Sequence, residues 1–344
     1  SECPEVNTLV GLFIIALTLS DLSNVSFRLL SLERPKEPEI EIISTKVTEE
    51  DEKDAWTDEF GVKYSKDGKK LIDCTDDNLT SYTIRQGTRI ICDGAFFFVR
   101  SLQSVTIPDS VTSIGDSVFW HCESLHSVTI PDSVTSIGDN AFMNCSSLQS
   151  VTIPDSVTSI GDSVFWFCSP LQSVIIPDSV TIIKGNPFPA CPAKVINHSN
   201  HFTIFEGNLY TSDRRKLISY LSKGENFIIP DSVTSIGRCA FECCTSLQSV
   251  TIPDSVTCIG GGAFWGCTSL QSVTIPDSVT SIDRGAFCDC KSLQYITIPD
   301  SVTSIGDRAF AFCSSLQSIF ISHKTYDRLK FKLEDFSSEI KFTD

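Results

Sequence analysis

Basic residues are scarce in this sequence, and the common motifs of catalysis are missing. Lys and Arg total 27 against 43 Asp and Glu, which gives a formal net charge of −16. Such a chain repels phosphate backbones, so nucleic acid is not expected as a partner. The sequence has no C-x-x-C pair, no phosphate-binding loop and no recognisable set of nucleophile, base and orienting residue. It therefore predicts neither an enzyme nor a bound cofactor or metal.

Long apolar runs are also missing. Residues 9–19 (LVGLFIIALTL) form an apolar run of eleven, whereas a helix needs ~20 residues to cross a bilayer. We interpret 1–20 as a truncated signal peptide that ends at Ser20, with a buried first element as the alternative. Residues 21–58 are charged and irregular and predict an acidic linker.

A 23-residue period dominates the rest of the chain. The tetrapeptide Ile-Pro-Asp-Ser recurs every 23 residues in two sets of four, which begin at Ile107, Ile130, Ile153 and Ile176 and at Ile229, Ile252, Ile275 and Ile298. Periods of this size indicate a solenoid, in which each unit buries its apolar face only against its neighbours. Removing one inward Phe, such as Phe142, should therefore also affect the adjacent units.

Within a unit, the apolar positions predict one short strand followed by a turn. Val151 and Ile153 are two residues apart, so both side chains lie on one face of a strand. Pro154 ends the strand, because proline cannot donate to a ladder. We expect the following Asp to bond its own backbone in the turn, with a stacked calcium site as the alternative.

The blocks SLQSVTIPDSVTSIG and the following A-F-x-x-C, as in Ala141, Phe142 and Cys145, carry a resemblance to a known family. The sequence resembles the BspA-like (Treponema pallidum-type) leucine-rich repeats over about residues 79–321. The resemblance implies a repeat solenoid of β-rich coils with short strands on the concave face. It also implies a surface or secreted protein that adheres to host matrix proteins or to other microbes.

Residues 194–226 interrupt the period, and a segment before the array has the same pattern. Residues 60–72 (FGVKYSKDGKKLI) align with the segment from Phe205 to Leu221, and both predict a hairpin. Near the end, Tyr326, Leu329 and Leu333 have helical spacing. The predicted order after the linker is a hairpin cap over 59–78, repeat units over 79–193, a long hairpin-containing unit over 194–226, repeat units over 227–321 and a C-terminal cap over 322–344.

Eight of the 15 cysteines share one repeat position. They are Cys122, Cys145, Cys168, Cys191, Cys244, Cys267, Cys290 and Cys313. Stacked side chains point the same way, which is poor disulfide geometry, so we expect buried thiols. Disulfides or a metal remain the alternatives. His198 and His201 make half a metal site at most, and no neighbouring ligands complete it.

The outward strand positions form a polar ribbon in which a few residues differ. We predict binding on this concave face, with candidates Ile175, Ile228, Tyr295, Phe320, Ser249, Thr251, Ser272 and Thr274. Exposed aromatics anchor interfaces, although Tyr295 and Phe320 could instead pack under the cap. Arg214, Arg215 and Lys216 form a basic hairpin patch that suits an acidic partner, or an ordinary solvated turn.

These observations favour a non-catalytic protein-binding solenoid. Our first hypothesis is an extracellular or cell-surface adhesion protein whose ligand is a protein of the extracellular matrix or of a host surface. The alternative is a cytoplasmic scaffold for protein–protein interactions, which the many cysteines favour. No membrane span is predicted in the visible chain.

Overall fold

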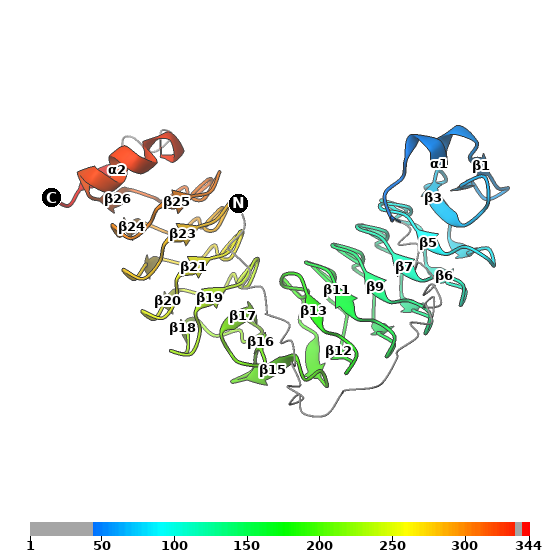
Figure 1. Ribbon diagram of the computed structural model, residues 1–344, viewed down its shortest axis with the longest axis horizontal. Helices are drawn as coiled ribbons and strands as arrows, with labels where there is room; N and C mark the ends of the chain where they lie inside the picture. Colours follow the sequence, from blue (N-terminus) through cyan, green and yellow to red (C-terminus); the bar gives the residue numbers. More distant parts are fainter. Residues whose placement is uncertain (1–43, 334–338) are drawn as a thin grey trace, which may run out of the picture. The chain divides into compact units, whose positions relative to one another are not determined.

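Short strands from successive repeats lie side by side and form the walls of a solenoid (Figure 1). The structure, a computed structural model, describes residues 44–333 and 339–344. By its contacts the chain divides into Ser1–Ser44 and Thr45–Asp344, and every element below lies in the second unit. The predicted signal peptide and residues 21–43 of the predicted linker lie outside the described residues.

Each repeat contributes two short strands rather than the single strand predicted. One wall begins with an eight-stranded sheet of β1 (Trp56–Thr57), β2 (Val62–Tyr64), β3 (Lys70–Cys74), β5 (Ile90–Ile91), β7 (Ser113–Ile114), β9 (Ser136–Ile137), β11 (Ser159–Ile160) and β13 (Ile182–Ile183). The other wall begins with β4 (Ser81–Thr83), β6 (Ser104–Thr106), β8 (Ser127–Thr129) and β10 (Ser150–Thr152), followed by the pair β12 (Ser173–Ile176) and β14 (Lys194–Asn197).

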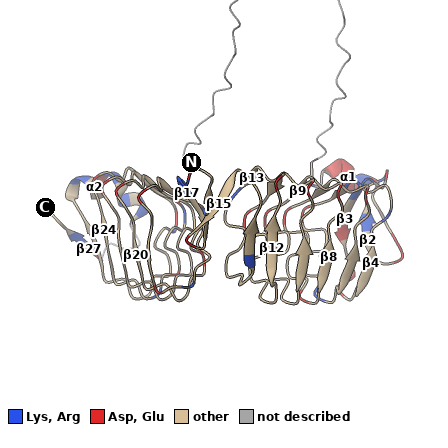
Figure 2. Ribbon diagram, turned by 90° about the horizontal axis from the view of Figure 1, so that it is seen from below, with Lys and Arg blue, Asp and Glu red and all other residues tan. Residues whose placement is uncertain are grey.

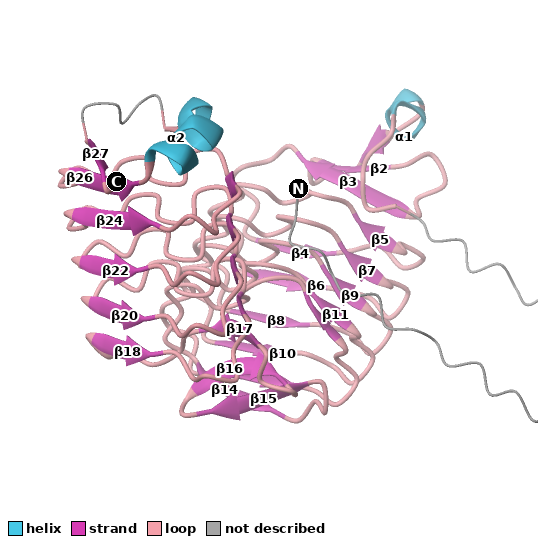
Figure 3. Ribbon diagram, turned by 60° about the vertical axis from the view of Figure 1, so that its left-hand side comes forward, coloured by secondary structure: helices cyan, strands magenta, loops and turns pink. Residues whose placement is uncertain are grey.

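The later repeats form a second set of two sheets. A seven-stranded sheet holds β15 (Phe202–Phe205), β16 (Asn208–Thr211), β17 (Lys216–Ser219), β19 (Ser235–Ile236), β21 (Cys258–Ile259), β23 (Ser281–Ile282) and β25 (Ser304–Ile305). A six-stranded sheet holds β18 (Asn226–Ile228), β20 (Ser249–Thr251), β22 (Ser272–Thr274), β24 (Tyr295–Ile298), β26 (Ser318–Ile321) and β27 (Ile340–Phe342). Figure 3 shows the strands of this last sheet one above another.

The second strand of each repeat arises because identical segments of adjacent repeats stack in register. The Thr158 N–H donates to the Thr135 carbonyl at 2.9 Å, and the Gly161 N–H donates to the Ile137 carbonyl at 2.9 Å. Once one strand is aligned, the next segment of the repeat meets its own copy at hydrogen-bonding distance, and its backbone groups must be paired. The parallel ladder therefore continues past the turn.

Serine, not aspartate, links the Pro-Asp-Ser turns. The turn closes through the Val157 N–H, which donates to the Pro154 carbonyl at 3.1 Å. The Ser156 hydroxyl donates to the Val134 carbonyl of the preceding repeat at 2.7 Å, and this bond recurs along the array. Among the described residues, no hydrogen bond joins the Asp carboxylate of these turns to its own turn backbone. The expected role of the Asp was therefore wrong, because the turn is satisfied by its backbone and by the serine.

Phenylalanine rings form a continuous stack inside each half. Phe119, Phe142 and Phe165 are fully buried, with ring centroids 5.3 and 5.8 Å apart and nearly parallel planes. A second stack contains Phe241, Phe264 and Phe287. The buried residues fall into two core clusters, which extend from Val62 to Ile218 and from Tyr210 to Leu333.

The two hairpins have the same geometry and begin the two halves. β2 pairs with β3 with a bulge between Lys63 and Tyr64, and β16 pairs with β17 with a bulge between Leu209 and Tyr210. Both Tyr64 and Tyr210 are fully buried. The equivalent residues are 146 apart. The segment 194–226 is therefore not simply a longer coil, because its hairpin begins a second sheet in the way that β2 and β3 begin the first.

Polar and aromatic contacts join the two halves. The Arg238 Nε donates to Asp162 Oδ2 at 2.6 Å, and the Asn186 amide donates to the Cys239 carbonyl at 2.8 Å. The rings of Trp166 and Trp265 lie 6.0 Å apart. We call this set the junction cluster. It also contains Glu242, which is 2% exposed.

The ends of the described array carry helices. α1 (Glu49–Lys53) begins with a capping box between Thr48 and Asp51, and Asp51 pairs with Lys70 of β3 at 2.7 Å. The last part of the predicted linker 21–58, residues 44–58, is therefore structured, because the capping box and the ion pair hold it against the hairpin. At the other end α2 (His323–Leu329) and η1 (Lys330–Lys332) bury Leu329 and Leu333, as their helical spacing predicts.

We predict that Phe142→Ala lowers the free energy of unfolding by roughly 3–5 kcal/mol, because it opens a cavity in the middle of a ring stack. Urea denaturation followed by circular dichroism measures this change. Phe312→Ala is the matched control, since Phe312 is 72% exposed and lies outside the stack, and it should cost less than about 0.5 kcal/mol. Equal losses in the two variants would contradict the role of the stack.

We also predict that the junction cluster makes stability depend on pH. Burial raises the pKa of Glu242 to about 7, from an ordinary value of 4.5, and the nearby Asp162 carboxylate raises it further. Between these pH values the folded chain keeps a proton that the unfolded chain releases, so stability falls as the pH rises from 4.5 to 7. This difference in pKa corresponds to a loss of roughly 3 kcal/mol in the free energy of unfolding when Glu242 is ionised.

Glu242→Gln removes the ionisation, so the variant should be more stable than the wild type at pH 8 and similar to it at pH 5. Urea unfolding at the two pH values measures the difference. Glu225→Gln is the control, because Glu225 is an exposed carboxylate of the same half. If Glu242→Gln changes stability equally at pH 5 and pH 8, burial does not set the protonation of Glu242.

Candidate functional site

The outward side chains of the six-stranded sheet form two straight rows. We call this surface the Ser-Thr face. In one row Ser249, Ser272, Tyr295 and Ser318 are register partners; in the other Ile228, Thr251, Thr274, Thr297 and Phe320 are partners. The rows are straight because every strand pair is parallel and adjacent repeats stack without a shift. Figure 2 shows few charged residues along β8, β20 and β24.

Tyr295 and Phe320 are the aromatic residues of these rows. Tyr295 opposes Ser318 and Phe320 opposes Thr297 on the adjacent strand, so the two rings are diagonal neighbours on one face. Tyr295 is 52% exposed and Phe320 is 36% exposed. The cap does not bury them, and Lys341 of β27 lies beside Phe320. The two rings present an open apolar spot on a hydroxyl-rich surface.

The structure separates the other apolar candidates from this pair. Ile175 lies on β12 of the first half and opposes Ile196 of β14. Ile228 lies on β18, the first strand of the six-stranded sheet, and is 73% exposed. The candidates therefore do not form one patch. Ile228 shares its row with Phe320, but Thr251, Thr274 and Thr297 lie between them.

The basic hairpin patch is spread over a tight turn. The Arg214 guanidinium lies over the Phe205 ring at 4.5 Å, and Arg214 has a positive φ of 56°. The Arg215 N–H donates to Asp213 Oδ1 at 3.0 Å, while Lys216 begins β17 and is half-buried. The same Asp-centred turn occurs in the first hairpin, where Asp67 Oδ1 accepts from Lys69 N–H. The conformation and hydrogen bonds of Arg214–Lys216 are therefore largely those of the hairpin turn.

The cysteine ladder consists of free thiols among the described residues. The Cys122, Cys145 and Cys168 thiols each donate to the carbonyl of the Phe 26 residues earlier, at 3.1–3.2 Å. Burial raises the pKa of Cys122 and Cys145, which keeps both protonated at neutral pH. Within residues 44–333 and 339–344, no group of three or more His, Cys, Asp or Glu is arranged for a metal ion. These thiols pack the core and satisfy backbone carbonyls.

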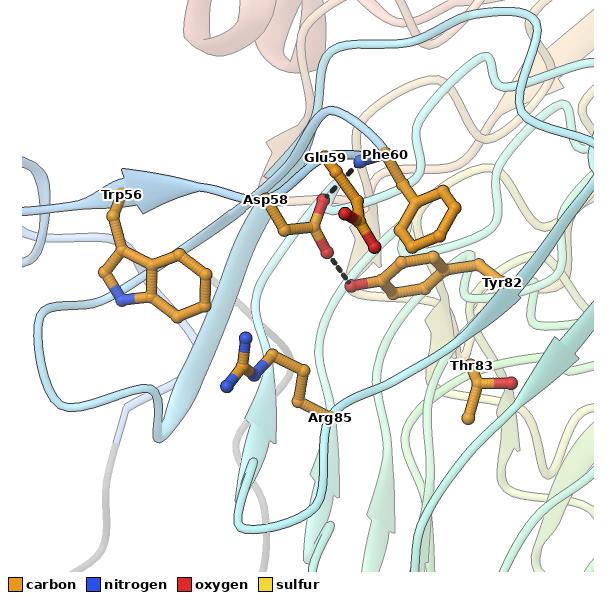
Figure 4. A pocket seen from close by; sticks show the side chains of 7 residues that line it. All are labelled: Trp56, Asp58, Glu59, Phe60, Tyr82, Thr83 and Arg85. Atoms are coloured by element: carbon orange, nitrogen blue, oxygen red, sulfur yellow. Dashed lines mark hydrogen bonds between the residues drawn. The ribbon is translucent and has the colours of Figure 1, made fainter.

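A shallow pocket lies beside the first strand of the second wall. We call it the cap pocket. Trp56, Asp58, Glu59, Phe60, Tyr82, Thr83 and Arg85 line it (Figure 4). The Tyr82 hydroxyl donates to Asp58 Oδ2 at 2.6 Å, and the Arg85 guanidinium lies 4.8 Å from the Trp56 ring centre. The sequence did not indicate this pocket, because its residues lie on both sides of the hairpin pattern and outside the Ile-Pro-Asp-Ser repeats.

The sequence also did not indicate the junction cluster. Arg238 occupies the repeat position that is Asp162 one half earlier, and Glu242 occupies the position of Trp166. Burial raises the pKa of Asp162, and the Arg238 guanidinium opposes that shift. The change from acid to base does not by itself indicate an ion pair, because Arg284 occupies the same repeat position two periods later.

In the part of the chain that the structure describes, no helix combines the length and apolar character of a membrane span. Among curated proteins, none matches the chain.

Comparison with solved structures shows the same architecture. A leucine-rich cell surface protein of Faecalibacterium prausnitzii is 34% identical, with 80% of this chain and 77% of that chain covered and a TM-score of 0.65. The pneumococcal vaccine antigen PcpA is 19% identical, with coverage of 78% and 81% and a TM-score of 0.61. A leucine-rich repeat protein of Eubacterium ventriosum is 24% identical, with coverage of 73% and 77% and a TM-score of 0.53. The last two likenesses concern the fold alone.

The family comparison agrees with the repeat itself. The model described as BspA type Leucine rich repeat region (6 copies) matches residues 73–195 and 217–333, which leaves out the segment that contains most of the second hairpin. The stacked parallel coils, the Phe ladder and this match confirm the predicted fold, and the chain belongs to the BspA-type leucine-rich repeat family.

Proposed function

We propose that this solenoid is a non-catalytic adhesion protein, secreted or displayed at a cell surface, that binds another protein through its Ser-Thr face. The observation that carries the proposal is the exposed aromatic pair Tyr295 and Phe320 within rows of serine and threonine. Leucine-rich repeat solenoids generally bind proteins, and a 34% identical relative is described as a cell surface protein.

The chemistry of the face suits a protein partner. Short hydroxyl side chains leave a flat surface that a second protein can approach closely, and they donate and accept hydrogen bonds. Tyr and Phe add rigid apolar area at low entropic cost, which is typical of interface anchors. Ser249, Thr251, Ser272 and Thr274 continue the rows away from the anchor and would supply the surrounding polar contacts. Proteins of the extracellular matrix or a host surface are the proposed partners.

A cytoplasmic scaffold is the second candidate. Thirteen cysteines are free among the described residues, and secreted proteins more often hold their cysteines in disulfides. Protease treatment of intact cells that make the protein distinguishes the two locations. Loss of the repeat array from unbroken cells supports the surface location, whereas digestion only after lysis supports the scaffold.

Two substitutions test the Ser-Thr face, and each introduces the residue found at the same position of the adjacent repeat. Tyr295→Ser copies Ser272 and Phe320→Thr copies Thr297, their register partners on the preceding strand, so the double variant should fold normally. We predict that it binds immobilised extracellular-matrix proteins at least tenfold more weakly than the wild type, in surface plasmon resonance. Loss of an interface anchor commonly costs 2 kcal/mol or about thirtyfold in affinity.

The control is Ile175→Thr, which makes the same kind of change on the first half. It should leave binding within about twofold. A matrix protein that binds the wild type and the double variant equally would place the binding site elsewhere. If no matrix protein binds the wild type, the proposed class of ligand is wrong.

A further inference from the structure

The strand β4, at the end of the four-stranded sheet of the first half, has an open edge. β4 is the last member of its sheet in the order β10-β8-β6-β4, and it pairs only with β6. The Thr80 carbonyl accepts from Ser104 N–H, and the Ile84 N–H donates to the Thr106 carbonyl, so these groups face β6. Backbone groups of alternate residues face opposite sides of a strand. The N–H and C=O groups of Ser81 and Thr83 therefore face away from β6, and no recorded hydrogen bond within residues 44–333 and 339–344 involves them.

The cap pocket lies directly beside this edge. Tyr82, Thr83 and Arg85 come from β4 and the residues after it, while Trp56, Asp58, Glu59 and Phe60 come from β1 and the turn that leads into β2 (Figure 4). Phe60 is half-exposed and packs edge-on against the Tyr82 ring. The side chains of a segment that paired with β4 would thus contact both aromatic and polar residues of the pocket.

The pocket offers one uncommitted carboxylate. Asp58 is occupied, because its two oxygens accept from Phe60 N–H, Val62 N–H and the Tyr82 hydroxyl. The Arg85 guanidinium is held over Trp56. Glu59 is exposed and makes no recorded ion pair within the described chain. Residues 45–85 contain eleven acidic and seven basic residues, so the surroundings add negative charge.

The chain shows at its other end that such an edge accepts a non-repeat strand. β27 is not part of a repeat, yet it adds in parallel to β26, where Glu339 accepts from Ile319 N–H and Thr343 N–H donates to Ile321. Its segment, Ile340–Phe342, combines apolar residues with a lysine. The sheet thus pairs with a short extended segment of basic and apolar character.

We propose that β4 and the cap pocket bind an extended peptide segment of a partner protein by strand addition. Its backbone pairs with Ser81 and Thr83, a basic side chain meets Glu59, and an apolar side chain packs on Phe60. Backbone pairing supplies affinity in this mode, and the pocket supplies selectivity. This site is separate from the Tyr295 and Phe320 anchor and does not depend on it.

The second half provides a natural comparison. β18 is the first strand of its sheet, and Ile228 stands 145 residues after Thr83 at the same place on an open edge. The residues equivalent to Trp56, Glu59 and Arg85 differ there: they are Phe202, Phe205 and Pro230. The pocket chemistry is therefore found at the β4 edge and not at the β18 edge.

The test uses the full chain and two fluorescent probe peptides, Lys-Val-Lys-Phe-Lys-Val and Glu-Val-Glu-Phe-Glu-Val, in fluorescence polarisation. We expect the basic peptide to bind and the acidic peptide to bind at least tenfold more weakly. Thr83→Pro removes the outward N–H but leaves the ladder to β6 intact, and it should weaken binding of the basic peptide at least tenfold. Thr83→Val keeps the N–H and removes only the hydroxyl, so it should bind within about twofold of the wild type.

Two further variants separate the contributions. Glu59→Gln should weaken the basic peptide and reduce the preference over the acidic one. Ile228→Pro makes the same change at the β18 edge and should have no effect. The proposal is overturned if the basic peptide fails to bind at millimolar concentration, if Thr83→Pro and Thr83→Val bind alike, or if only Ile228→Pro weakens binding. Because Tyr295 and Phe320 are unchanged in these variants, this outcome is independent of the adhesion experiment.

Discussion

In-register stacking of nearly identical repeats is the constraint on which the rest of this structure depends. It brings the Phe rings, the thiols and the strands of adjacent repeats next to their own copies. Once one of these contacts is in register, the others are in register too. The approach between coils is close, because a Cβ added to Gly138 would overlap the Gly115 carbonyl carbon. Other repeats hold Cys92, Lys184 or Asp283 at this position, and there the backbone N–H still donates to the preceding coil. The frequent glycine after the buried isoleucine thus suits the close approach of the coils, although it buries no apolar surface and is not present in every repeat.

The sequence was sufficient to predict this stacking, because every repeat has the same pattern of apolar and polar residues. The buried positions Val151, Phe165 and Cys168, the hairpin segments and the terminal helix follow from period and spacing. The second strand was not predicted, since a segment such as Ser159–Ile160 is too short to show an alternating pattern. The exposure of Tyr295 and Phe320 was also undecided, because it depends on where the cap lies and not on the repeat. Contacts such as Asp162 with Arg238 join residues 76 apart, a separation that is not a multiple of the period.

The second hairpin shows why a long array of this kind needs more than repeats. Its bulge, its buried tyrosine and its Asp-centred turn reproduce the first hairpin. Each hairpin buries a tyrosine in a core. Its last strand, β3 or β17, pairs in parallel with the first repeat strand that follows, β5 or β19. Leu209 and Ile218 belong to the first core, whereas Tyr210 and Leu217 belong to the second. One hairpin thus ends one core and begins the next, and the junction cluster adds polar and aromatic contacts between the two halves.

Near-identical repeats also limit where recognition can reside. A partner that contacts only Ser249 and Thr251 could bind equally well one repeat later, at Ser272 and Thr274, so the regular rows define no unique register. A unique position arises only where the pattern changes or the array ends. Tyr295 and Phe320 are such a change, and the β4 edge is such an end. A substitution at an outward position costs the fold little stability. The outward residues of a repeat can therefore change without disturbing the buried stack beneath them. Within a single repeat, the outward residues set binding specificity and the buried residues set stability.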